Sequence, residues 1–231
     1  MKISILQLIN GAQKAEGLTV VIDVFRAFSL ECYLYAEGAE LIIPVADLSE
    51  AFRIKDENPG FILIGERNEQ KVEGFQFGNS PKEVQGIDFS GKTIVHTTSA
   101  GTQGIINATK ADEIITGSFV NAGSIIRYIQ RKNPVKVSLV CMGYSAQKPI
   151  EEDTLCAQYI YNQLKGFDMD FEKIIHTIRN TSGKRFFNPD LSEHNPSEDF
   201  DLCLDLDRFN FIIRAEKQIN GLIFNKKIGV D

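Results

Sequence analysis

The stretch LTVVIDVFR, residues 18–26, indicates the fold class of this chain. Its segment Leu18–Val24 is apolar except for Thr19 and Asp23, which is typical of a strand buried on both faces of a parallel sheet. Further strand-like runs occur along the chain, and helix-like segments lie between them. This alternation predicts an α/β fold, a three-layer α/β/α sandwich around a mostly parallel, mixed sheet.

The expected elements can be placed by residue range. The predicted strands are Lys2–Ile9, Leu18–Val24, Leu41–Val45, Phe61–Ile64, Thr93–Thr97, Glu113–Thr116 and Val135–Cys141. The predicted helices are Ser29–Gly38, Leu48–Glu57, Thr102–Thr109, Ala122–Lys132, Glu151–Leu164 and Phe171–Asn180. The stretch from Phe209 to Ile228 predicts a hairpin around Asn220-Gly221, at an antiparallel edge of the sheet. We expect residues 1–231 to form a single domain.

Composition excludes several classes of protein. The 231 residues are 43% hydrophobic and 24% charged, which is ordinary for a soluble globular chain. The net charge is −6 and no basic stripe is present, so a nucleic-acid partner is not expected. No apolar run approaches the roughly 18 residues of a membrane span. Ser4 and Gln7 interrupt the apolar N-terminal run and no cleavage pattern follows, so we expect a cytoplasmic protein.

Cysteine and histidine positions give no metal or redox motif. No cysteine pair has C-x-x-C spacing, and free thiols fit a reducing cytoplasm. The four cysteines are Cys32, Cys141, Cys156 and Cys203. The three histidines, His96, His176 and His194, form no H-E-x-x-H motif, so a histidine-rich metal site is not expected.

Polar residues follow the predicted strands at their carboxyl ends, where ligands bind in open α/β sheets. Asp23 and Arg26 follow the strand that ends near Ile22, and they suit a metal and an anion respectively. An Asp–Arg pair that only closes the strand end explains them equally well.

A second group of polar residues follows the strand Phe61–Ile64. Glu66 and Arg67 begin a long polar loop, and such loops are often functional. The loop ends at Asn79 and Ser80, where Ser80 before a proline predicts a helix start. That helix start explains Ser80 but neither Asn79 nor the charged pair.

A turn rich in hydroxyl groups follows the strand Thr93–Thr97. Hydroxyl and N–H donors at a helix start favour anion binding, although a cap needs only one of these hydroxyls. The candidate substrate-binding residues in this turn are Thr97, Thr98, Ser99, Gly101 and Thr102. His96 is expected to be a packing residue at the strand end.

Acidic residues open the predicted helix at 151–164. Glu152 and Asp153 suit the positive end of the helix dipole, but three consecutive acids exceed what a cap requires. Together with Asp23 and Glu66 they can form an all-oxygen site of the kind that Mg²⁺ prefers. Together, these carboxylates, arginines, hydroxyl groups and N–H groups favour Mg²⁺-assisted phosphoryl chemistry on a small anion.

Four segments resemble, in order along the chain, the 2-phosphosulfolactate phosphatase family. They are VVIDVFRAFS (20–29), GERNEQKVEGFQFGNSP (65–81), TTSAGTQG (97–104) and EDTLCA (152–157). The resemblance implies a Mg²⁺-dependent phosphatase that converts (2R)-2-phospho-3-sulfolactate to 3-sulfolactate and phosphate, in the sulfolactate branch of coenzyme M biosynthesis. These segments contain the residues to which we assign roles as a hypothesis. We place Asp23, Arg26, Glu66 and Arg67 in catalysis, Asn79 and Ser80 in substrate binding together with the hydroxyl-rich turn, and Asp23, Glu66, Glu152 and Asp153 around the metal.

Several alternatives stay open at this point. A haloacid-dehalogenase-type phosphatase also carries an Asp after its first core strand, but it would need a second Asp where this chain has Phe25. A domain that binds a small anionic phosphate ester without turnover is the non-enzymatic alternative. The attacking group, water or the Asp23 carboxylate, is not decided, and a homo-oligomer is left open.

Overall fold

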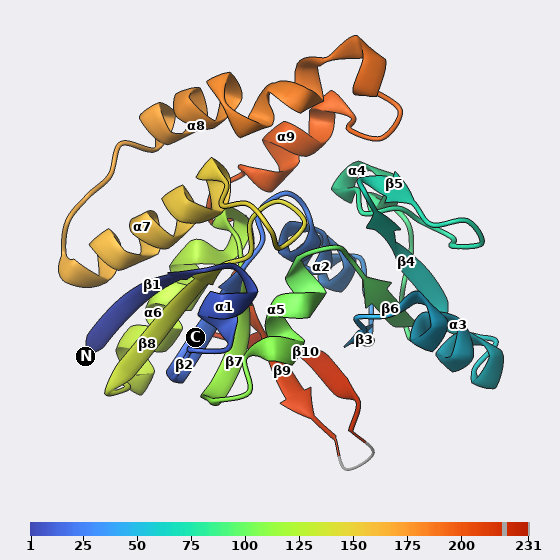
Figure 1. Ribbon diagram of the computed structural model, residues 1–231, viewed down its shortest axis with the longest axis horizontal. Coiled ribbons are helices and arrows are strands. Elements are labelled where there is room, and N and C mark those ends of the chain that lie inside the picture. The colour runs from blue at the N-terminus through green and yellow to red at the C-terminus, as the bar shows by residue number, and fades with distance from the viewer. Residues whose placement is uncertain (219–220, 231) are drawn as a thin grey trace.

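The computed structural model describes residues 1–218 and 221–230, and its strands belong to one sheet (Figure 1). The strands are β1 (Lys2–Gln7), β2 (Gly17–Ile22), β3 (Leu41–Pro44), β4 (Ile62–Arg67), β5 (Gln70–Lys71), β6 (Thr93–Thr97), β7 (Ala111–Gly117), β8 (Lys136–Cys141), β9 (Phe211–Lys217) and β10 (Ile223–Gly229).

Helices connect most of these strands. The α-helices are α1 (Leu8–Ala12), α2 (Ala27–Ala36), α3 (Leu48–Glu57), α4 (Pro81–Val84), α5 (Gly101–Asn107), α6 (Ala122–Lys132), α7 (Glu151–Lys165), α8 (Phe171–Asn180) and α9 (Ser197–Cys203). Three 3₁₀ helices are η1 (Phe119–Asn121), η2 (Ser182–Phe187) and η3 (Pro189–Leu191). Within the described residues, no helix has the length and apolar character needed to cross a membrane.

The predicted elements are confirmed with shifts of a few residues at their ends. Helices α3, α6 and α8 and strand β6 have the predicted bounds. The first strand is shorter than predicted, because α1 begins at Leu8 within the expected strand Lys2–Ile9. Residues 183–201 are mostly polar, and they contain most of η2, all of η3 and the start of α9.

The predicted mixed α/β sheet is confirmed, but the position of its hairpin is wrong. The strand order is β1-β8-β2-β7-β9-β10-β3-β6-β4-β5, so the hairpin of β9 and β10 lies inside the sheet. It separates a parallel block β1-β8-β2-β7 from a parallel block β3-β6-β4. The pairings of β7 with β9, of β9 with β10 and of β10 with β3 are all antiparallel, and these three reversals mean that the two blocks are paired in opposite directions along the sheet.

The sequence of the hairpin explains why it appeared to be an edge. Its outer half is charged at Arg214, Glu216, Lys226 and Lys227, as edge strands usually are. Its inner half, Phe211–Ile213, is buried on both faces, which an interior position requires. The predicted turn residue Asn220 lies outside the described residues.

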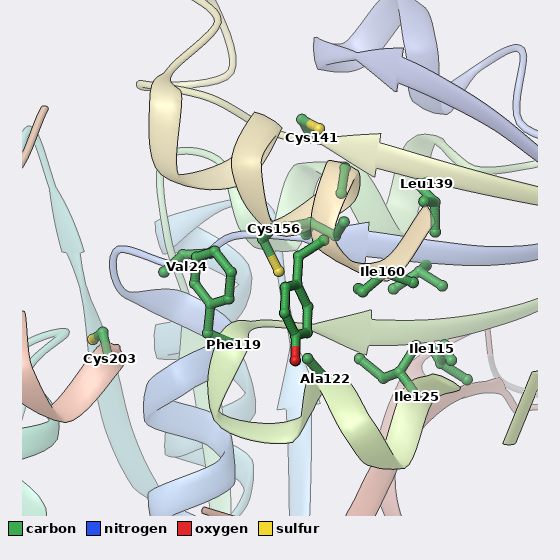
Figure 2. Close-up of a cluster of buried hydrophobic side chains, with 14 of the residues drawn as sticks. Val24, Ile115, Phe119, Ala122, Ile125, Leu139, Cys141, Cys156, Ile160 and Cys203 are labelled. Atoms are coloured by element: carbon green, nitrogen blue, oxygen red, sulfur yellow. The ribbon is translucent and has the colours of Figure 1, made fainter. Parts of the chain in front are cut away.

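Alternate residues of β2 pack against opposite helical layers, which confirms the three-layer arrangement. Val20 and Ile22 belong to the core under α6 and α7, where Ile125 and Ile160 also pack (Figure 2). Val21 belongs to the core on the other face, with α1 and α5. All four cysteines are free and buried, as expected.

Candidate active site

Several segments that are distant in sequence meet at one cavity beside the carboxyl ends of β2, β4, β6 and β8. The space between the atoms of its wall is about 490 Å³, a figure that includes solvent at its open mouth. Its wall comes from residues Asp23, Phe25, Arg26, Glu66, Glu69, Asn79, Ser99, Ala100, Gly143, Tyr144, Ser145, Ile150, Glu152, Asp153 and Arg185. The sequence-predicted residues Asp23, Arg26, Glu66, Asn79, Ser99, Glu152 and Asp153 are therefore brought together.

Asp153 ties two strand ends to the start of α7. Its Oδ1 accepts the backbone N–H of Val24 at 2.9 Å, and its Oδ2 accepts that of Gly143 at 2.8 Å. Gly143 has a positive φ of 68°, and a Cβ there would lie 2.3 Å from the Lys148 carbonyl oxygen. Asp153 thus fixes the loops after β2 and β8, which form part of the cavity wall.

Asp23 sits at the end of β2 beside the first turn of α2. Its Oδ1 accepts the Ala27 backbone N–H at 3.2 Å, and its side chain is nearly buried. Its Oδ2 would lie 2.9 Å from a Cβ on Gly101, so the start of α5 approaches closely only because residue 101 is glycine. Asp23 therefore lies between the starts of two helices.

The buried carboxylates raise one another's pKa. Burial raises the pKa of Asp23 to about 7; the Ala27 N–H opposes this shift, and Glu66 and Glu152 add to it. Burial also raises the pKa of Asp153, and the charges of Asp23 and Glu152 reinforce the effect. A site with this repulsion favours a proton or a cation among its carboxylates.

Glu152 carries the least satisfied carboxylate of the cavity. It is 1% exposed, and its Oε2 has no hydrogen-bond partner among the described residues. Its Oε1 lies 3.9 Å from Arg185 Nη2. Burial raises its pKa, and Arg185 lowers it in part.

Glu66 occupies donors of the hydroxyl-rich turn that was expected to bind an anion. Its Oε1 accepts the Ser99 N–H at 2.6 Å, and its Oε2 accepts the Ser99 hydroxyl at 3.1 Å and the Glu69 N–H at 2.8 Å. Gly65 allows this approach, since its φ is +152° and a Cβ would lie 2.0 Å from the Thr97 carbonyl oxygen. The turn therefore holds a carboxylate of the chain itself.

The other predicted residues of this turn lie behind the cavity wall. Thr98 and Thr102 bond to each other: the Thr98 N–H donates to Thr102 Oγ1 at 3.3 Å, and the Thr102 hydroxyl donates to the Thr98 carbonyl at 3.1 Å. Thr97 Oγ1 accepts from Arg67 Nη2 at 2.7 Å. These contacts hold the turn before α5 together, and the three threonines do not line the cavity.

The two arginines predicted for catalysis have different surroundings. Arg67 donates to the carbonyls of Glu66 and Ala46 as well as to Thr97, and it does not line the cavity. Arg26 lines the cavity and donates from Nη1 to Asp199 Oδ2 at 2.7 Å. Arg26 is thus the one placed near a ligand.

Asp199 closes the side of the cavity behind Arg26. Its Oδ1 accepts the Ser80 hydroxyl and the Lys82 N–H, both at 2.9 Å. The predicted helix start at Ser80 is confirmed, but its hydroxyl bonds Asp199 and makes no side-chain cap. Ser80 is buried and lies outside the cavity wall.

Sequence reasoning missed Arg185 and Asp199. Arg185 stacks on the rings of Phe25 and Phe186 and lies 3.2 Å from Glu69, and its Nε has no hydrogen-bond partner among the described residues. Both residues belong to the polar stretch 183–201, and its length was the available signal. Nothing in its local pattern indicated which residue turns inward.

The donor set suits a hard cation. In the described ranges 1–218 and 221–230, no three His, Cys, Asp or Glu side chains already form a cation cluster. Five carboxylates nevertheless line one cavity, and one of their buried oxygens has no partner among the residues described. Oxygen ligands of this kind match Mg²⁺, so the expected metal fits these residues and stays a prediction.

Comparison with known proteins gives one family. The family model described as 2-phosphosulpholactate phosphatase matches residues 3–218. A protein of Caldanaerobacter subterraneus subsp. tengcongensis is 31% identical over an alignment of 229 residues, which covers 93% of this chain and 93% of its own. A protein of Thermotoga maritima is 40% identical over 167 residues, 70% of this chain and 71% of its own. Both are named "Probable 2-phosphosulfolactate phosphatase". The chain therefore belongs to the 2-phosphosulpholactate phosphatase family, a family of phosphoric monoester hydrolases.

Proposed function

We propose that the protein hydrolyses (2R)-2-phospho-3-sulfolactate to 3-sulfolactate and phosphate with the help of Mg²⁺. The observation that supports this best is the cavity itself, whose wall contains five carboxylates as well as Arg26 and Arg185. Carboxylates can hold a cation, and guanidinium groups can hold the anionic substrate. Membership in the family supplies the substrate.

The arginines would bind and orient the substrate. Phosphosulfolactate carries phosphate, carboxylate and sulfonate groups, and the net charge of −6 gives no long-range attraction, so recognition has to be local. Arg26 and Arg185 each present a planar fork that matches two oxygens of such a group. We expect one arginine to serve the phosphate and the other to serve an end that does not react.

The carboxylates would hold the metal. Asp23 and Glu152 are the best placed, because Asp23 has a raised pKa and Glu152 has a buried oxygen without a partner among the described residues. Asp153 and Glu66 surround them and fix the loops. When bound, Mg²⁺ would neutralise charge on the phosphoryl oxygens.

The attacking group is either water or the Asp23 carboxylate. An acid-quenched single turnover would trap phosphate on the protein if Asp23 attacks. Solvent ¹⁸O would appear in phosphate in the first turnover if water attacks. The haloacid-dehalogenase alternative gains no support from the neighbouring position, because Phe25 packs on Phe186 with ring centroids 4.7 Å apart.

The proposal is tested by phosphate release from phosphosulfolactate. Release with Mg²⁺ and none in excess chelator supports it, and full activity in chelator removes the metal from it. Binding without release would favour the anion-binding domain. Phospholactate, which lacks the sulfonate, should react roughly 10²-fold more slowly, since a lost charge-assisted contact leaves its partner unpaired. Equal rates would argue for a phosphatase of broader specificity.

The proposed substrate also indicates the pathway of the reaction, and the cysteines bear on the compartment. A 3-sulfolactate product would place the reaction in the sulfolactate branch of coenzyme M biosynthesis. We propose that this takes place in the cytoplasm, where four buried free thiols are compatible with a reducing environment.

A further inference from the structure

A chain of buried polar side chains runs from the cavity into the centre of the sheet. It joins Asn79 on the cavity wall, His96 on β6, Glu31 on α2 and Asn225 on β10. His96 Nε2 lies 3.4 Å from Asn79 Oδ1, and His96 Nδ1 lies 3.0 Å from Glu31 Oε1. Asn225 Nδ2 donates to both oxygens of Glu31, at 3.0 and 2.9 Å.

With Glu31 ionised and the Asn79 amide placed with Oδ1 toward His96, the donors and acceptors of this chain leave one arrangement. The Glu31 carboxylate only accepts, so His96 Nδ1 carries a proton and donates. His96 Nε2 faces the Asn79 carbonyl oxygen, so it carries a proton as well. The ring is then an imidazolium paired with a carboxylate, and both are fully buried.

Asn79 is oriented by this contact. Its Oδ1 is directed to His96, while its Nδ2 has no hydrogen-bond partner among the described residues. Asn79 is 8% exposed and lines the cavity next to Arg26. A neutral ring would accept from Nδ2 instead and would turn the carbonyl oxygen of Asn79 outward.

Burying the charges of His96 and Glu31 costs free energy of folding, which argues that the pair has a role besides packing. Taking a carboxylate and an imidazolium out of water is only partly repaid by their attraction, and apolar side chains would often serve stability as well. The pair also has a long reach, since it connects the C-terminal hairpin to the cavity wall. A role at the site accounts for its position.

We propose that His96 and Glu31 are positioning residues that hold the Asn79 amide with its NH₂ group toward the anionic substrate. The proposal rests on the function proposed above. Asn79 touches the substrate, His96 fixes the amide, and Glu31 fixes the charge and tautomer of His96. The 3.4 Å contact between His96 and Asn79 should shorten when the amide NH₂ binds an anion, as catalytic contacts commonly do in the complex.

A double-mutant cycle between Glu31→Gln and Asn79→Ala tests the coupling. The introduced glutamine has nearly the same shape as Glu31, and Asn225 can turn its amide to meet it, since Asn225 Oδ1 has no partner among the described residues. We expect N79A to lower kcat/KM by roughly 10- to 100-fold and E31Q by about 10-fold. In the N79A background E31Q should have no further effect. Equal losses in both backgrounds would overturn the proposal.

A matched control separates positioning from general damage to the core. Thr19→Val removes a buried hydroxyl that has no partner among the described residues and is not connected to Asn79. Its kcat/KM should stay within about 2-fold of the unaltered enzyme. A loss as large as that of E31Q would mean that any change in the sheet lowers activity, and the proposal would fail.

A measurement on the unaltered protein keeps the inference independent of the substrate. The chain has three histidines, so ¹⁵N spectra of the ring nitrogens can be assigned to His96 with H176Q and H194Q. Both nitrogens of His96 should be protonated at pH 7, and a neutral ring would overturn the proposal. Calorimetry with inorganic phosphate should show weaker binding to N79A and E31Q, whereas unchanged binding would count against it. If the enzyme fails on phosphosulfolactate but these results hold, only the proposed substrate is wrong.

Discussion

Two groups of buried charges meet at the cavity, and they are balanced in different ways. Arg26 and Asp199 neutralise each other at 2.7 Å, and Ser80 and Lys82 satisfy the remaining Asp199 oxygen. Asp23, Glu152 and Asp153 crowd together with raised pKa values and no cation of the chain at hydrogen-bond distance from Asp23 or Asp153 among the described residues. The first group closes on itself, whereas the second needs a proton, a metal or a ligand to balance it. The first group therefore supports the cavity wall and holds Arg26 in it, whereas the second group is where a proton or a metal is expected.

The largest effect is expected at the unbalanced group. Asp23→Asn should lower kcat/KM for phosphate release by about 10³-fold or more, because the site loses either its nucleophile or a metal ligand. The fold should persist, since the change relieves carboxylate repulsion. Steady-state kinetics and thermal melting measure both, and D170N at an exposed helix cap is the matched control. Activity within 10-fold of the unaltered enzyme would remove Asp23 from the chemistry.

A substitution in the balanced group, Arg26 and Asp199, should lower the free energy of unfolding. Asp199→Asn leaves the charge of Arg26 buried without its partner and should cost roughly 3–5 kcal/mol, a fall in Tm of about 6–20 °C. D205N breaks the half-exposed pair with Arg208 and should cost less than about 1 kcal/mol. If the two variants melt alike, Asp199 is not the support that its burial indicates.

The pH dependence of stability separates the two groups further. The pKa of Asp23 is raised to about 7 from an ordinary 3.8, so the folded state holds its proton more tightly than the unfolded state does. Its contribution is favourable below pH 4 and is lost as pH rises through 7, by a few kcal/mol at most. Without metal, the stability of the unaltered protein relative to D23N should therefore fall between pH 4 and pH 7. A difference that is flat with pH would contradict the raised pKa.

The smallest effect is expected at the cavity mouth. Arg185→Ala should lower kcat/KM by roughly 10- to 100-fold and reduce the preference for phosphosulfolactate over phospholactate. Arg179 also stacks on aromatic rings, those of Phe187 and Phe200, but does not line the cavity, so R179A should stay within about 3-fold. Equal losses in both variants would assign the effect to stacking alone.

Most of the fold could be predicted from local patterns of the sequence. The period of apolar residues placed α6 and α8 with their observed bounds, because helix formation depends on residues three and four positions apart. The same holds for the buried strands. The hairpin was predicted at the edge of the sheet because its charged tips have the composition of an edge strand. It lies inside the sheet because β9 pairs with β7 and β10 pairs with β3.

The site could be predicted where a residue lies at the end of a strand or opens the helix that follows the strand. Asp23 and Glu66 lie at strand ends, and Glu152 and Asp153 open α7; all four line the cavity. Arg67 did not, because the carbonyls of Ala46 and Glu66 and the Thr97 hydroxyl bind its guanidinium, and none of these partners is visible in its own segment.

The sequence by itself determined the α/β class, the position of most elements and the acidic character of the site, since these depend on short windows of the chain. Only the tertiary structure decided which charges are balanced. Arg26 and Asp199 are 173 positions apart, and Glu31 and Asn225 are 194 positions apart. Such pairs form when packing of the whole sheet brings separate segments together, and Coulomb energies in a buried environment depend on the distances so fixed.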